Sequence, residues 1–233
     1  MKLSLATALT LTTLFAQSTW AETFQIEITN LTHGNYFTPL LITAHPAGTH
    51  LFQAGAQASV GLQTMAEEGD IALLVNDLQG LGADVVSNPA GGLMAPGQIV
   101  TTTLETQSNS NTQLSVVAMI LPTNDGFIGL DAVPLPTAPG SYTFNLNGYD
   151  AGTEANDELI TGSGAIGTPG IPAAPGGDGG QNGTGVTSTE TNPLVHIHRG
   201  VLGDTDPNGG PSDLDSRIHR WLNPVARVVV TVQ

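Results

Sequence analysis

The chain has 233 residues, no cysteine and a formal net charge of −15, with 20 acidic residues against five basic ones. Binding to nucleic acid through its phosphates requires a basic surface, which this composition excludes. Without cysteine no disulfide can form, so the fold depends on core packing or on bound metal.

The N-terminus has the layout of a secretory signal peptide. Lys2 precedes an apolar run from Leu3 to Ala16, and small residues follow up to Ala21, which is the order of the charged, apolar and cleavage regions in such leaders. We therefore expect residues 1–21 to be a signal peptide and residues 22–233 to form one exported domain, either periplasmic or secreted. No later apolar run reaches the length of about 20 residues that crosses a membrane.

Short alternating or apolar segments, separated by turns rich in Gly, Pro and Asn, predict an all-β fold. The expected strands are Phe24–Thr29, Pro39–His45, Gln98–Thr106, Gln113–Leu121, Phe127–Ala132, Ser141–Leu146, Pro193–His198 and Pro224–Val232. Residues 54–68 favour a short helix that ends at Gly69, and residues 71–77 are either a second helical turn or a strand. Eight such strands favour an antiparallel β-sandwich.

Between Leu146 and Asn192 the chain has little strand character. Gly, Pro and Ala dominate residues 162–185, and a structureless stretch of this length within a compact domain is either functional or flexible. We expect a flexible Gly/Pro-rich loop over residues 162–185, outside the sandwich.

Residues 124–158 contain six carboxylates and no Lys, Arg or His. Asp150 and Glu154 stand on either side of Gly152, and a glycine lets the loop fold back so that both carboxylates face one point. Calcium prefers oxygen ligands of this kind. The spacing therefore predicts a calcium site, and the alternative is a solvated acidic loop that binds nothing.

Histidines offer a second candidate site. His196 and His198 flank Ile197 on an expected strand, so both imidazoles would point to the same face. Together with His45, or with His219, they would form a copper or zinc site, because imidazole suits those metals. With His45 as the third ligand, the chain would be a periplasmic metal-binding protein. The simpler interpretation is a hydrogen-bonded polar cluster of these strand residues with Asp204, Asp213 or Asp215. Trp221 is expected in the core, with a carbohydrate-stacking role only if it is exposed.

Signatures of catalysis are missing. The sequence contains neither a Gly-x-Ser-x-Gly elbow nor a His-Glu-x-x-His helix. Asp150 and Glu154 lie four residues apart in one glycine loop, which suits ligation of a cation better than the two carboxylates that flank a sugar in a glycosidase. We therefore expect no enzymatic activity.

A set of segments spread over the chain follows one family pattern: Phe37-Thr38-Pro39, Ala66–Gly69, Asp125–Gly129, Tyr149–Glu154, Val195–Asp204 and Asn223–Val228. In combination they resemble the spondin domain family, in its bacterial exported branch. The resemblance extends from about Phe24 to Val232.

This resemblance implies an eight-stranded antiparallel sandwich, similar to calcium-dependent membrane-binding domains, and one calcium held by Asp125, Asp150 and Glu154. Glu154 stands where the animal members have aspartate, so the third ligand has a longer side chain here. The resemblance also implies a non-catalytic domain that mediates adhesion or binding at the cell envelope or extracellular matrix.

Overall fold

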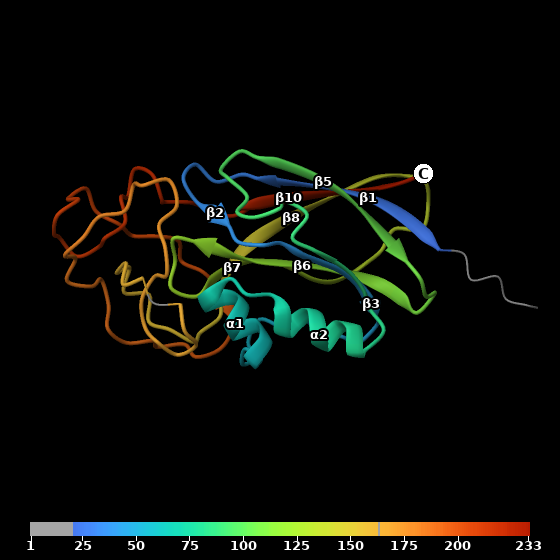
Figure 1. Cartoon of the computed structure of the whole chain (residues 1–233), viewed down its shortest axis with the longest axis horizontal. Helices are drawn as coiled ribbons and strands as arrows, with labels where there is room; N and C mark the ends of the chain where they lie inside the picture. Colours follow the sequence, from blue (N-terminus) through green and yellow to red (C-terminus); the bar gives the residue numbers. More distant parts are fainter. Residues whose placement is uncertain (1–20, 163) are drawn as a thin grey trace, which may run out of the picture.

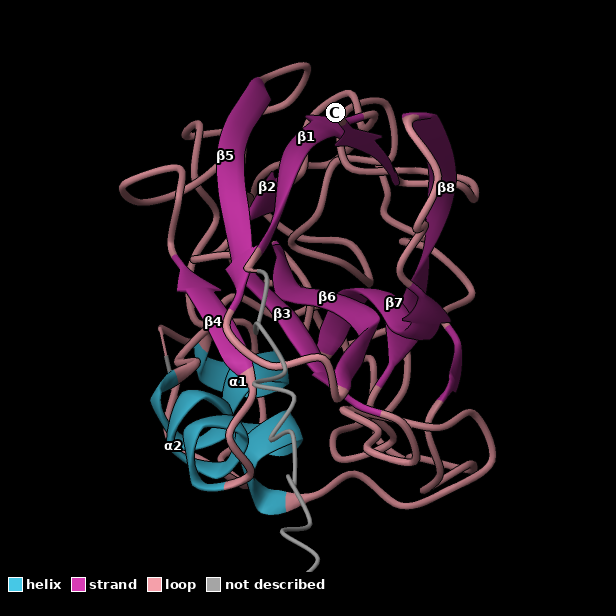
Figure 2. Cartoon of the chain, turned by 90° about the vertical axis from the view of Figure 1, so that its right-hand side faces the viewer, coloured by secondary structure: helices cyan, strands magenta, loops and turns pink. Residues whose placement is uncertain are grey.

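The computed structural model describes residues 21–162 and 164–233, and residues 1–20 of the expected signal peptide lie outside the described residues. Eight antiparallel strands form one nearly closed sheet in the order β4–β3–β6–β7–β8–β10–β1–β5, with β2 paired to β6 and β9 to β8 (Figures 1 and 2). The strands are β1 (Glu22–Asn30), β2 (Tyr36–Phe37), β3 (Leu41–Pro46), β4 (Asp84–Ser87), β5 (Ile99–Thr106), β6 (Asn111–Leu121), β7 (Gly126–Pro134), β8 (Gly140–Asp150), β9 (His196–Ile197) and β10 (Ala226–Val232).

The sheet curls around its core, and β6 is buried on both of its faces. Val116 and Ala118 point into the main core with Ile26 and Ile28 of β1, whereas Val117 and Met119 pack under the helices. A strand that is covered on both faces has a nearly continuous run of apolar residues in its sequence. This explains why the apolar run of β6 is not interrupted by alternating polar residues.

Two helices cover the outer face of the sheet beside β6 and β3 (Figure 2). They are α1 (Val60–Glu68) and α2 (Ala72–Gly80). Ser59 caps α1 by accepting a hydrogen bond from the N–H of Leu62, and Gly69 ends it with φ of 74°, a left-handed conformation that glycine adopts without steric cost. The predicted helix stop is confirmed, and the ambiguous segment after it is a helix. None of the helices in the described part of the chain is both long and apolar enough to span a bilayer.

The antiparallel pairing and the eight-strand sheet are as expected, but one member differs. The eighth strand of the sheet path is β4, whereas the segment expected at Pro193–His198 contributes only the two residues of β9. The N–H of Val195 donates to Ala56 in a loop rather than to a strand, and Pro193 has no N–H to donate. Within the described residues, β4 forms a strand by pairing with β3 alone, through all four of its residues.

Long loops from residues 151–225 gather at one end of the sheet, at the left of Figure 1. Residues 162 and 164–185 form no helix and no strand of the sheet. Ile171 is nevertheless buried, and the N–H of Gly180 donates to the carbonyl of Asp213 at 2.7 Å. The segment therefore packs against the C-terminal loops, and its flexibility stays a prediction.

Candidate functional site

The register of β7 and β8 brings Asp125 and Asp150 together. Asp125 immediately precedes β7, and Asp150 ends β8 opposite Gly126. The N–H of Ala151 donates to the carbonyl of Asp125 at 3.2 Å. Both aspartates are buried, with 0% and 1% of their surface exposed, so two carboxylates share one water-excluded corner.

Asp125 has one satisfied and one unsatisfied carboxylate oxygen. Its Oδ2 accepts hydrogen bonds from the N–H of Thr153 (2.8 Å), the hydroxyl of Thr153 (3.1 Å) and the N–H of Glu154 (3.1 Å). Its Oδ1 is buried and has no partner among the described residues. Because buried polar atoms are almost always hydrogen-bonded, this oxygen fits a role as a ligand of a hard cation.

Asp150 is held rigidly by its own loop. Its Oδ1 accepts from the N–H of Gly152 at 2.8 Å, and its Oδ2 accepts from the side-chain amide of Asn156 at 2.6 Å. Gly152 has φ of +72°, and a Cβ there would lie 2.7 Å from the backbone nitrogen of Leu194. The turn therefore requires glycine, as the sequence predicts.

Glu154 joins this corner through its backbone rather than its carboxylate. Its N–H binds Asp125, whereas its Oε2 accepts from the N–H of Gly170 at 3.1 Å. Among residues 21–162 and 164–233, no group of three or more His, Asp or Glu side chains is arranged to hold a metal ion. The structure thus pairs two of the three expected calcium ligands and turns the third carboxylate toward Gly170.

All three carboxyl groups have pKa values above their ordinary range. Burial, and then the Asp150 carboxylate, raise the pKa of Asp125 to about 7. Burial also raises the pKa of Asp150 and brings the pKa of Glu154 to about 8. Ionised carboxylates are thus unfavourable here unless positive charge is added, and a bound cation would supply it.

We expect the calcium-free protein to lose stability as pH rises from about 6.5 to about 8.5. In this window the folded state still holds protons on Asp125 and Glu154 that the unfolded state has lost, so the free energy of unfolding falls. The buried His198, whose pKa burial lowers to about 3, acts in the opposite direction only below its ordinary value of 6.5. Calorimetric Tm values in chelator at three pH values test this, and a rising Tm would contradict it.

Comparison with known families agrees with the segments seen in the sequence. A family model described as Spondin_N matches residues 7–160. The chain belongs to the Spondin_N family. The matched region of this spondin domain includes Asp125, Asp150 and Glu154, and it ends before the histidine strand. None of the curated proteins compared with the chain matches it.

The three histidines of the alternative site do not meet in this spondin domain. His45 pairs with Gln113, which lies opposite Pro134 at the far end of β7 from Gly126 and Asp150. The Nε2 of His45 bonds the hydroxyl of Ser115 at 2.7 Å. His45 is therefore not part of one metal site with His196 and His198, because the sheet holds them at opposite ends.

His198 has no nitrogen left for a metal. Its Nδ1 accepts from the N–H of Gly200 at 2.9 Å, so its Nε2 carries the proton and donates to the side chain of Asn156 at 3.0 Å. The Nδ1 of His196 lies 3.8 Å from the carboxylate of Asp150. The two histidines are hydrogen-bonded as in a polar cluster, but their partners are Leu194, Asn156 and Gly200 rather than the expected Asp204, Asp213 or Asp215.

Trp221 is buried, with 7% of its surface exposed. Its ring packs against Gly148, where a Cβ would lie 2.4 Å from the indole, and against the ring of His198 at 5.1 Å. The carbohydrate-stacking interpretation required an exposed ring, so this position is a core residue.

Two residues near the site were not singled out from the sequence. Asn156 bonds both Asp150 and His198, and an uncharged amide leaves no pattern that would reveal this. Glu158 is buried and accepts from the N–H groups of Leu202 (2.7 Å) and Gly203 (2.8 Å). The one signal in the sequence that could have identified Glu158 is its position in the acidic stretch of residues 124–158. Its carboxylate anchors the C-terminal loops.

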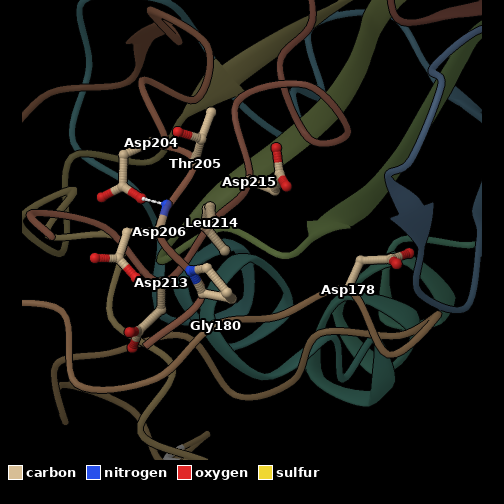
Figure 3. A pocket seen from close by; sticks show the side chains of 9 residues that line it. Asp178, Gly180, Asp204, Thr205, Asp206, Asp213, Leu214 and Asp215 are labelled. Atoms are coloured by element: carbon tan, nitrogen blue, oxygen red, sulfur yellow. Dashed lines mark hydrogen bonds between the residues drawn. The ribbon is translucent and has the colours of Figure 1, made fainter. Parts of the chain in front are cut away.

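A separate acidic cavity lies in those loops, lined by Asp178, Asp204, Asp206, Asp213 and Asp215 (Figure 3). Asp204 accepts from the N–H groups of Asp206 (2.7 Å) and Ser212 (3.0 Å), and Asp213 accepts from that of Gly183 at 2.8 Å. The spacing of Asp204, Asp206 and Asn208 before Gly209 matches the start of a calcium-binding loop, but among the described residues no three acidic or histidine side chains are arranged to hold a metal ion. These carboxylates fasten the backbone of the loops.

Proposed function

We propose that this spondin domain is an exported, non-catalytic, calcium-binding domain that mediates adhesion or binding at the cell envelope or extracellular matrix. The observation that carries the proposal is the unpartnered, fully buried Oδ1 of Asp125 beside the buried carboxylate of Asp150. These two acids are shielded from water, and among the residues that the structure describes no Lys or Arg is bonded to either, so a cation would stabilise the pair.

Asp125 and Asp150 would hold the calcium. Glu154 is the third candidate ligand, since its N–H already binds Asp125 and its carboxylate needs only to exchange its bond to Gly170. Bound calcium supplies positive charge between the loop before β7 and the loop after β8. It would thereby fix the base of the long loops at that end of the sheet, where a partner would bind.

Export and a sandwich-type fold complete the proposal. The leader-like N-terminus supports export to the periplasm or the outside of the cell. Two facing sets of strands support the sandwich description, because Ile26 and Val228 meet Val116 and Ile128 in one core. No specific contact favours the copper or zinc alternative.

Calorimetric titration of chelator-treated protein with calcium, and then with copper and zinc, tests the proposal. We expect saturable calcium binding that Asp150→Asn removes. Asp77→Asn is the matched control, because it deletes one exposed carboxylate on α2 and should leave binding unchanged. The proposal fails if calcium gives no saturable heat, or if Asp77→Asn abolishes the binding and Asp150→Asn does not.

A further inference from the structure

A polar cavity of about 220 Å³ adjoins the carboxylate pair. Its lining consists of Asp150, Asn156, Thr187, Thr189, Glu190, Thr191, His196, Ile197 and Arg199. We propose that this cavity binds a neutral saccharide unit through its hydroxyl groups. The inference rests on the proposed function, for which it names the class of ligand.

The lining matches hydroxyl groups better than it matches an ion or an apolar group. The carboxylates of Asp150 and Glu190 are partly offset by the guanidinium of Arg199, so the cavity carries little net charge. Threonine hydroxyls both donate and accept, as sugar hydroxyls do. Ile197 is the one lining residue with a purely apolar side chain, so an apolar ligand would leave the polar groups without partners.

The cavity is organised before a ligand enters. Asn156 links two other lining residues: its side-chain amide donates to Asp150 at 2.6 Å, and its backbone carbonyl accepts from Arg199 at 3.0 Å. His196 is fixed as well, because its Nδ1 donates to the carbonyl of Leu194 at 2.8 Å, and its Nε2 is left as an acceptor. Groups held in place in this way bind without a large loss of side-chain entropy.

Asp150 belongs to both the cavity and the proposed calcium site. A calcium bound at Asp125 and Asp150 would fix the position of the Asp150 carboxylate, and so preserve it as an acceptor for a sugar hydroxyl. Saccharide affinity should therefore be higher in calcium than in chelator.

Affinity for a single sugar should be weak. None of the lining residues is Phe, Tyr or Trp, so the contact lacks a large stacking surface, and a Kd on the order of 1–10 mM is expected for a ligand of this size. A repeated glycan on a surface would engage many copies of the domain, and such multivalency raises apparent affinity by about 10²–10⁴.

Two-dimensional NMR of the isotope-labelled protein tests the inference. The probes are the methyl glycosides of glucose, galactose, mannose and N-acetylglucosamine, with free glycine and glutamate for comparison, each titrated in calcium and again in chelator. We expect at least one glycoside to shift the amide signals of the lining residues saturably. Glu190→Ala and His196→Ala should each weaken this binding by at least about fivefold. Ser188→Ala is the control, because Ser188 is exposed between two lining threonines and does not line the cavity.

The outcomes separate this inference from the proposed function. Calcium binding without any glycoside shift overturns the saccharide assignment and leaves the calcium site intact. Saturable binding of free glycine or glutamate in place of the glycosides also overturns it, since the ligand is then an amino acid. Glycoside binding in a protein that takes no calcium supports the cavity and overturns the calcium proposal. If an alanine variant does not fold, Thr191→Val, which removes one lining hydroxyl, gives the same test.

Discussion

Asp125→Asn should abolish the stabilisation of this protein by calcium without weakening the calcium-free protein. The asparagine carbonyl can accept the bonds that Oδ2 now receives from Thr153 and Glu154. Its amide would take the place of the unpartnered Oδ1, and being uncharged it would not repel Asp150. The calcium-free variant is therefore expected to be at least as stable as the parent at neutral pH.

Calcium should raise the Tm of the parent protein but not that of Asp125→Asn. A ligand present at about 100 times its Kd stabilises the folded state by about 2.7 kcal/mol, which for a domain of this size corresponds to a rise in Tm of about 5–10 °C. We expect this rise in the parent and none in Asp125→Asn, measured by scanning calorimetry with and without calcium. An equal rise in both would remove Asp125 from the site.

Phe127→Ala should cause the largest loss of stability of any change near the site. Phe127 is fully buried. Its ring packs edge-on against Phe52 at 5.1 Å and is stacked with Tyr149 at 5.7 Å. Truncating a buried phenylalanine costs about 3–5 kcal/mol, because apolar contacts are lost and a cavity remains.

Urea unfolding followed by fluorescence measures this effect. Tyr142→Ala is the control, since Tyr142 is a partly exposed aromatic residue of β8 whose hydroxyl bonds Ala138, and its loss should cost about 1 kcal/mol. Calcium should still raise the Tm of Phe127→Ala, because no carboxylate is removed. An equal cost in both variants would show that the aromatic cluster does not stabilise the fold.

Much of the architecture follows from local sequence. The continuous apolar run of β6 predicts a strand buried on both faces, and packing on its two sides confirms this. Gly69 ends α1 where the sequence places the stop. These features depend on side-chain periodicity and backbone preference over a few residues, so they can be read without tertiary contacts.

Local sequence predicts only part of the candidate site. Gly152 between Asp150 and Glu154 predicts the tight turn, and the structure has it. The sequence gives no means to see that the Glu154 carboxylate turns to Gly170, because that bond depends on how a distant loop packs. His45 shows the same limit, since a residue type that suits a metal says nothing about which other histidines the sheet brings near.

By itself, the sequence determined the strand-rich fold, the end of the first helix and the acidic glycine turn, because each arises from neighbouring residues. Tertiary structure alone decided that β4 completes the sheet, and the register of β7 and β8 places Asp125 beside Asp150, as the family resemblance implies. Tertiary structure also decided that Asn156 joins Asp150 to His198. Strand register sets these contacts, and register is fixed by the packing of the whole sheet rather than by any one segment.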